Sequence, residues 1–140
     1  MIRGRPPRST ALALLHAQGL PTSDITDEHL EHFFFVGSED SPTGLVGLEI
    51  YGRNALLRSL VVGDNARRRG LGSTLTDHAE QYAASKSVRS IYLLTATAET
   101  FFRRLGYVCI DRSQAPPSIE RTREFASLCP ASSAFMVKSL

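Results

Sequence analysis

The sequence predicts a single α/β domain, spanning residues 1–140, in which helices cover a mostly antiparallel sheet of about six or seven strands. Two observations predict this class. Three runs of apolar and β-branched residues follow one another through short turns between residues 33 and 62, which is typical of an antiparallel meander. From residue 70 onwards, helical and strand-like patterns alternate instead. A chain of 140 residues fits one hydrophobic core.

The first half supplies the meander and the helices before it. Gly19 is expected to stop the first helix, because glycine is common just after a helix end. The strand from Ala55 to Val62 is almost continuously apolar, as expected of a central strand covered on both faces. In order, we expect a strand from Met1 to Arg5, a helix from Ser9 or Thr10 to Gln18, a helix start capped by Thr26 with His29 at its third position, and strands at 33–36, 45–51 and 55–62.

The second half is expected to pack helices and strands around that meander. Gly70 and Gly72 open a helix whose apolar residues recur at helical spacing. A buried strand from Ser90 to Thr95 follows. The remaining elements are expected to be a helix capped by Thr97 or Thr100 and ended by Gly106, a strand from Tyr107 to Ile110, a short helix that follows Pro116-Pro117-Ser118 and runs to about Phe125, and a closing strand from Ala134 to Val137.

Bulk composition excludes several functions. The net charge is only +2, so the whole molecule carries no strong field for nucleic acid or for an anionic membrane. No apolar run approaches the ~18–20 residues that a membrane-spanning helix needs. Cys109 and Cys129 match neither a zinc pattern nor a redox pair, so we expect free thiols and no metal site. The expected location is the cytoplasm.

The segment from Leu60 to Gly72 carries the clearest chemical signal. There a buried strand runs through a turn directly onto the start of a helix. The first amides of a helix have no internal partners, and the helix dipole adds partial positive charge at the same end. Because glycines let a ligand approach the backbone, this arrangement predicts a pyrophosphate site, which Arg67, Arg68 and Arg69 strengthen. The spacing fits neither a dinucleotide fingerprint nor a nucleotide P-loop.

These residues resemble the GCN5-related N-acetyltransferase (GNAT) family, whose pattern at this point is Gln/Arg-x-x-Gly-x-Gly/Ala. Arg67, Gly70 and Gly72 match the pattern, and the segment from Phe101 to Tyr107 resembles the aromatic segment that follows later in the family. The resemblance covers almost the whole chain. It is closest to small acetyltransferases associated with arsenic-resistance operons, through the segments Leu56-Leu57-Arg58-Ser59-Leu60, Tyr92-Leu93-Leu94-Thr95 and Ser127-Leu128-Cys129-Pro130-Ala131-Ser132.

The resemblance implies acetyl-coenzyme A as cofactor and a GNAT-type sheet with a splay between the strands from Ala55 to Val62 and from Ser90 to Thr95. The pantetheine arm would enter this gap, and a backbone N–H near Val62 would polarise the thioester carbonyl, which meets the need of acyl transfer for a fixed donor. Thr95 and Phe102 are expected beside the cofactor. The expected backbone contacts are Leu60, Val61 and Val62 for the pantetheine, and Arg67, Arg68, Arg69, Gly70, Leu71, Gly72 and Ser73 for the pyrophosphate.

Three residues depart from the family. Arg68 occupies the first glycine position of the longer form of the motif, and Thr95 replaces a frequent asparagine. Phe102 stands where many members have a tyrosine that acts as the general acid, and phenylalanine cannot donate a proton. The acid therefore lies elsewhere, or water assists the leaving thiolate, or catalysis is weak.

Four residues are candidates for the remaining roles, each with a second interpretation. Glu49 is the candidate general base, or a solvent-facing carboxylate. Arg58 lies in an apolar strand, so it either pairs with Glu49 or binds a substrate carboxylate. Tyr107 is the candidate acid, or it packs in the core. Cys129 is either an arsenic ligand or a small apolar filler.

The sequence thus favours an acetyl-coenzyme A-dependent N-acetyltransferase. The acceptor is expected to be the amine of a small molecule, with amino-acid-like and arsenic-containing compounds both open. The alternative is a catalytically weak coenzyme A-binding accessory or sensor domain, which Phe102 favours. A nucleic-acid-binding module based on the three arginines is disfavoured by the low net charge. No membrane partner is expected, and a homodimer is left open because many family members dimerise.

Overall fold

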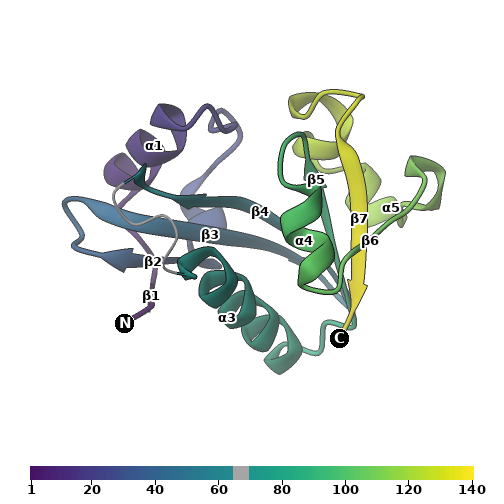
Figure 1. Cartoon of the computed structure of the whole chain (residues 1–140), viewed down its shortest axis with the longest axis horizontal. Helices are drawn as coiled ribbons and strands as arrows, with labels where there is room; N and C mark the ends of the chain where they lie inside the picture. Colours follow the sequence, from purple (N-terminus) through teal and green to yellow (C-terminus); the bar gives the residue numbers. More distant parts are fainter. Residues whose placement is uncertain (65–69) are drawn as a thin grey trace.

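The computed structural model describes residues 1–64 and 70–140 of the chain. Within these ranges, seven strands form one sheet in the order β1-β2-β3-β4-β5-β7-β6 (Figure 1). All neighbouring pairs are antiparallel except β4 and β5, so the predicted α/β class with a mostly antiparallel sheet is confirmed. The strands are β1 (Arg3–Gly4), β2 (Phe33–Gly37), β3 (Pro42–Tyr51), β4 (Asn54–Val62), β5 (Ser90–Thr95), β6 (Val108–Cys109) and β7 (Ala134–Ser139).

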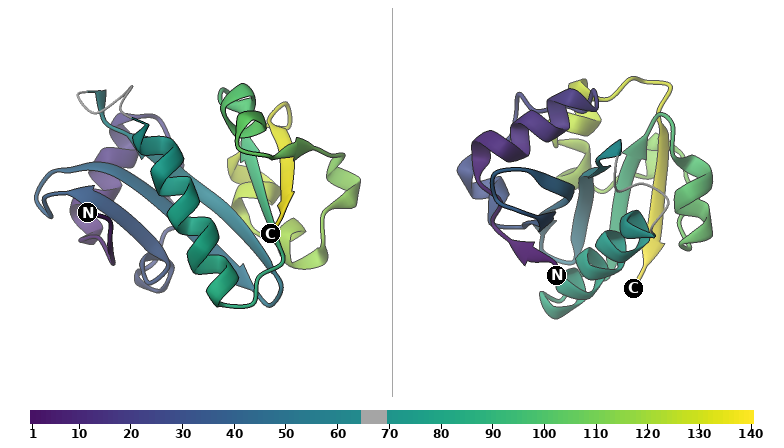
Figure 2. Two further views of the ribbon diagram at one scale, coloured as in Figure 1. Left: turned by 60° about the horizontal axis from the view of Figure 1, so that its bottom comes forward. Right: turned by 60° about the vertical axis from the view of Figure 1, so that its left-hand side comes forward.

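Helices cover both faces of the sheet. Helix α3 (Leu71–Ser85) packs across β3 and β4 on one face, and α1 (Arg8–Ala17) and α2 (Asp27–Leu30) cover the other (Figure 2). Helix α4 (Glu99–Arg104) lies beside β5, and α5 (Pro117–Glu120) packs against β4. Throughout the described ranges, every helix falls short of the length and apolarity that crossing a bilayer requires.

Alternation along the meander divides the core between the two faces. In β2, Phe34 and Val36 join the cluster under α3, whereas Phe33 and Phe35 join the cluster under α1. Side chains of a strand point alternately to opposite faces, so a run of four apolar residues serves both layers at once. A third, smaller cluster gathers Ile119 and its neighbours beneath β5 and β7. The sheet is therefore buried on both faces, as the continuous apolar strand predicted.

Local signals placed several helix ends correctly. Thr26 accepts a hydrogen bond from the His29 N–H, and His29 Nδ1 accepts one from the Thr26 N–H, which forms the predicted cap of α2. Gly19 follows α1 with φ +74°, the left-handed conformation expected after a helix end. These two features fix the two ends of the connection between α1 and α2, and residues 18–21 of this connection border a cleft.

Other boundaries differ from the sequence-based expectation. Helix α1 begins after Pro7, whose ring presets the backbone angle at that position. Pro7 has no side-chain acceptor, so the helix has no side-chain cap. The predicted caps of α4 were wrong: its N-cap is Ala98, whose N–H donates to Thr95 Oγ1. The single helix predicted after Pro116-Pro117-Ser118 is instead two elements: α5, which already begins at Pro117, and a separate π-helical turn, η3 (Glu124–Leu128). That break determines where Glu124 points.

Candidate active site

A cleft opens where strands β4 and β5 separate. The two strands pair in parallel only from Asn54 opposite Ser90 to Leu56 opposite Tyr92. Beyond these pairs they diverge, as Figure 1 shows, and a cleft of about 490 Å³ lies there. The predicted splay between these strands is therefore confirmed. The described lining consists of residues 18–21, 57–60, 93–98, 102, 124, 128–130 and 133.

A β-bulge distorts β4 at the cleft. The register of β3 against β4 shifts between Leu45 and Gly47, so that two residues, Ser59 and Leu60, oppose one. Ser59 has φ +59°, a left-handed conformation that is uncommon for residues other than glycine. Both bulge residues line the cleft. Bulges and strained residues of this kind cluster at functional sites, where they redirect the chain.

Helix α3 begins next to the end of β4. Its N-cap, Gly70, has φ +70°, and no atom of the described residues lies within 4 Å of the position where a Cβ would stand. A Cβ on Gly72 would lie 3.2 Å from Phe101 Cζ and 3.9 Å from Val62 Cγ2, so glycine lets α3 approach α4 and β4 closely. The first turn of α3 contains no acidic residue that would neutralise its dipole. Residues 65–69, which include the three predicted arginines, lie outside the described residues.

Arg58 gathers three carboxylates at the edge of the cleft. Its Nη1 donates to Asp24 Oδ2 at 2.5 Å and to Glu49 Oε2 at 2.8 Å. Its Nη2 donates to Asp24 Oδ1 at 2.8 Å and lies 3.2 Å from Glu124 Oε2. Its Nε donates to Ser59 Oγ at 3.1 Å. One buried cation therefore meets three buried carboxylates, which come from the α1–α2 connection, β3 and η3.

This excess of negative charge shifts the pKa values within the cluster. Burial, reinforced by the charges of Asp24 and Glu49, raises the pKa of Glu124 to about 7 despite the attraction of Arg58. Burial also disfavours a charged Asp24, but the hydrogen bonds and charge of Arg58 outweigh it and lower the pKa of that carboxyl. Burial likewise opposes the charge on Arg58, but the surrounding carboxylates raise its pKa overall, so it stays charged. Glu124 is thus the member that titrates near neutral pH.

Sequence comparison agrees with this geometry. Residues 7–107 match the acetyltransferase (GNAT) family, which is most of the chain. The chain belongs to that family. It is also 30% identical over 95 residues to an uncharacterised N-acetyltransferase of Chlorobaculum tepidum. That match covers 67% of this chain and 61% of the relative, so the chain spans about three fifths of the relative's length.

Solved structures share the acetyltransferase fold at low sequence identity. N-acetylglutamate synthase from Neisseria gonorrhoeae, complexed with coenzyme A and N-acetyl-glutamate, superimposes with a TM-score of 0.84 at 17% identity, covering 100% of this chain and 35% of that one. The protein Rv2747 from Mycobacterium tuberculosis, solved in complex with coenzyme A, gives a TM-score of 0.79 at 19% identity over 100% of this chain and 99% of that one. At these identities, the likeness concerns the fold.

The structure distributes the residues predicted for the acetyltransferase cofactor between the cleft and its surroundings. Leu60, Thr95 and Phe102 line the cleft. Val61 is buried in the cluster under α1, and Val62 packs against the cluster under α3. Thr95 Oγ1 already accepts the Ala98 N–H at 2.9 Å, which shapes the turn between β5 and α4. Leu71 and Ser73 are half-buried in the first turn of α3. Cofactor contact at these positions stays a prediction.

Tyr107, the candidate acid, is built into the core. It is 1% exposed, its ring packs edge-on against Phe102, and its hydroxyl donates to Glu80 at 3.0 Å. Burial and the neighbouring Glu80 raise its pKa above the usual range of tyrosine. The cleft lining, within the part of the chain that the structure describes, does not include Tyr107. These contacts support the packing interpretation, and the catalytic one stays an untested prediction.

Glu49, the candidate base, faces the side of the sheet opposite Val46 and Leu48, as predicted from alternation. It forms the predicted pair with Arg58, and Tyr51 donates its hydroxyl to the other carboxylate oxygen. It lines a separate hollow of about 530 Å³ between α2 and β3, and it is not among the described residues that line the cleft. Its role as the base stays a prediction.

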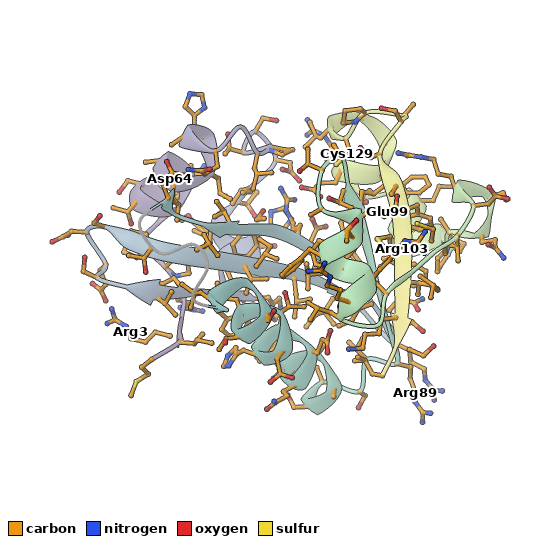
Figure 3. All side chains as sticks on the ribbon, viewed as in Figure 1. Arg3, Asp64, Arg89, Glu99, Arg103 and Cys129 are labelled. Atoms are coloured by element: carbon orange, nitrogen blue, oxygen red, sulfur yellow. The ribbon has the colours of Figure 1, made fainter. Side chains whose placement is uncertain are left out.

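Cys129 lies beside Glu124 at the cleft, near the upper ends of β5 and β7 in Figure 3. Burial and the adjacent Glu124 raise the pKa of its thiol to about 11, and the thiol donates a hydrogen bond to that carboxylate. Cys109 is exposed, and both cysteines are free, as predicted. The raised pKa lowers the fraction of thiolate, which is the form that ligates soft metals and metalloids. Arsenic binding at Cys129 stays an untested prediction.

Sequence reasoning missed Asp24 and Glu124. Arg58 gave the one usable signal, because a buried arginine needs acidic partners. Only Glu49 was identified, since it lies on the neighbouring strand. Asp24 belongs to an irregular connection and Glu124 to a segment predicted as ordinary helix, so neither had a periodic pattern that places it near residue 58.

Proposed function

We propose that this chain is an acetyl-coenzyme A-dependent N-acetyltransferase that acetylates the amine of a small molecule. The observation that carries the proposal is the cleft at the β4–β5 splay, which has a bulge in β4 at one wall and a buried acidic cluster at its edge. Family membership supports the same reaction. Fold neighbours solved with coenzyme A, and one of them with N-acetyl-glutamate, support a small acceptor.

The described residues fit the proposed cofactor. The stretch where β4 and β5 no longer pair leaves room for an extended arm, and the open, positive end of α3 suits a diphosphate. Bound acetyl-coenzyme A would supply the acetyl group as a thioester. The amine nitrogen would bond to the acetyl carbon as the C–S bond breaks. A neutral amine would lose one proton while the departing sulfur gains one, and an amine that binds as an ammonium would first give one further proton to the base.

The acidic cluster suits removal of the proton from the amine. Glu124 lines the cleft, and its pKa of about 7 lets it accept a proton near neutral pH. Glu49, the base predicted from sequence, stays a second candidate. It is hydrogen-bonded to Arg58, which lines the cleft, and is not itself among the described lining residues. For the proton returned to sulfur we assign no side chain, because Phe102 cannot donate one and Tyr107 is bonded to Glu80.

The finer expectations on the acceptor rest on resemblance. An amino-acid-like acceptor is favoured by the neighbour that binds N-acetyl-glutamate, and an arsenic-containing one by the likeness to operon-associated acetyltransferases. The alternative function, a weak coenzyme A-binding accessory domain, is favoured by Phe102 at the position where many family members have the acid.

The proposal is tested by mixing the purified chain with acetyl-coenzyme A and a panel of amines, and measuring the release of free thiol. Coenzyme A affinity is measured in parallel by calorimetry. We expect micromolar-range binding and turnover on at least one amine that falls at least ~10²-fold in Glu124→Gln, the size typical of a lost general base. Glu49→Gln tests the second candidate in the same assay.

The outcomes separate the two functions. Coenzyme binding without turnover on any amine would replace the enzyme with the accessory domain. A folded chain that shows no heat of binding with millimolar coenzyme A would contradict both functions and leave only the fold.

A further inference from the structure

Few charged residues line the cleft, and they differ in how far other residues already engage them. Among the lining residues that the structure describes, only Arg58 and Glu124 carry a charge. The rest of the described lining is neutral: it is mostly apolar, through leucines and Phe102, with a few polar side chains such as Gln18, Thr95 and Thr97. Among the described residues, an acceptor therefore meets one charged partner for an anion and one for a cation.

The possible partner for an anion is already occupied. Each nitrogen of Arg58 has a partner within 3.2 Å: Ser59 for Nε, and carboxylates for Nη1 and Nη2. The Arg58 side chain has 0% exposed surface. To bind a substrate carboxylate, it would have to release Asp24, Glu49 or Glu124, and that carboxylate would be left buried without its cation. Breaking a buried pair in this way is strongly unfavourable.

The possible partner for a cation keeps acceptor capacity, because Glu124 receives one contact from Arg58 and one from the Cys129 thiol, and a carboxylate can accept more. Three carboxylates around one guanidinium leave the cluster with surplus negative charge, and Glu124 is the member that borders the cleft. Its side chain keeps 6% of its surface exposed. A cation placed there would offset the surplus, whereas a second anion in the same apolar space would be repelled and poorly solvated.

We propose that the acceptor is a cationic primary amine with no carboxylate beside its nitrogen, and that its ammonium group docks on Glu124. This inference rests on the proposed acetyltransferase function and names its substrate class. The apolar walls take the body of such an amine, and Arg58 acts as a positioning residue that holds Glu124 and its neighbours in place. The acceptor thereby differs in charge from the glutamate derivative bound by the Neisseria fold neighbour.

The test uses matched pairs of amines that differ only in the carboxylate. Phenethylamine is compared with phenylalanine, 3-methylbutylamine with leucine, and each amino acid with its methyl ester, which masks the charge and keeps the shape. We expect kcat/KM to be at least ~100-fold higher for the amine and the ester than for the amino acid, because the carboxylate finds no partner. Calorimetry with coenzyme A bound should rank the same compounds in the same order of affinity.

Glu124→Gln tests the docking residue, with Glu120→Gln as the matched control. Glu120 lies four residues earlier and is exposed. In Glu124→Gln, KM for the amine should rise at least ~10-fold and the preference over the amino acid should shrink, because the anchoring charge is gone. In Glu120→Gln, both should be unchanged. Thermal unfolding and coenzyme A affinity establish that the variants fold.

Two results would overturn the inference. One is an amino acid that is acetylated, or bound, as well as its matched amine. The other is a preference for amines that is undiminished in Glu124→Gln. In both cases turnover itself would still support the acetyltransferase. Absence of turnover on every amine and amino acid would instead remove the acetyltransferase, and this inference with it.

Discussion

The buried charges around Arg58 set the behaviour of single residues at the cleft. A carboxylate is held in a dry site only if a cation compensates it, and here one guanidinium is shared among three. Asp24 takes the bidentate contact and keeps a lowered pKa. Glu124 receives a single, longer contact and cannot stay ionised as easily. The cluster thus gains or loses one proton, on Glu124, near neutral pH.

The raised pKa of Glu124 predicts a pH-dependent cost to folding. A carboxyl with a folded-state pKa of about 7 binds more protons in the folded than in the unfolded state between about pH 4.5 and 7. Stability from this group is therefore present below that window and is lost as the pH rises through it. Between pH 5 and pH 8, Glu124→Gln should gain about 2 kcal/mol in free energy of unfolding relative to the unmodified protein. Urea unfolding at both pH values measures the change, and a difference independent of pH would contradict it.

At the level of elements, β4 lines the cleft, and its neighbour β3 packs against β2 through a close backbone approach. Gly47 in β3 lies against the ring of Phe33 on β2, so close that a Cβ would stand 2.3 Å from Phe33 Cε1. Phe33 itself is fully buried in the cluster under α1. One residue further along the register, β4 bulges at Ser59. The absence of a side chain at Gly47 therefore lets the Phe33 ring pack against β3 next to the bulge in β4.

Substituting Gly47 should therefore be costly. Gly47→Ala forces the Phe33 ring to shift within a packed core and should lower the free energy of unfolding by about 3 kcal/mol. Gly4→Ala is the control, because a Cβ there would meet the Phe34 ring at an ordinary 3.7 Å. Denaturant midpoints of the two variants give the comparison. Equal midpoints would show that the sheet accommodates the methyl group at Gly47 without strain.

The elements that periodicity governs were predictable, and those that tertiary contacts govern were not. The meander and helix α3 follow from their apolar patterns, and Thr26 and Gly19 from local chemistry. The bulge at Ser59 left no sequence signal, because serine has no special preference for the left-handed region. The break before Glu124 likewise depends on packing, so the sequence did not predict that Glu124 contacts Arg58. At the site, the strands and Glu49 were found, and the residues supplied by irregular segments were not.

On the scale of the whole molecule, the sheet consists of two parts that meet at three residue pairs. Strands β1 to β4 form one part, and β5, β7 and β6 form the other, joined in parallel near Leu56 and Tyr92. Core residues under α3 tie the parts together at that end. At the other end the strands of the two parts diverge (Figures 1 and 2), and residues of both parts line the cleft there. A ligand in the cleft would contact both.

Coenzyme A should therefore stabilise the molecule as a unit. At a coenzyme concentration of 100 times Kd, binding adds about 2.7 kcal/mol, which corresponds to a rise in Tm of roughly 10 °C for a domain of this size. Gly70→Trp should lose this rise, because the large side chain occupies the open space at the start of α3. Its own Tm is expected to be lower, since residue 70 has φ +70°. An equal ligand-induced rise in both proteins would contradict the placement of the cofactor at α3.

The cluster around Arg58 also has a consequence for the order in which the site is assembled during synthesis. Asp24, Glu49 and Arg58 are all synthesised before the last third of the polypeptide, so two of the three carboxylates that contact Arg58 in the folded chain are present before Glu124 is made. Glu124 follows Arg58 by 66 residues. Under the proposed docking role of Glu124, a ribosome stalled before η3 would carry Arg58 with two of its three carboxylate partners and without the group proposed to bind the amine.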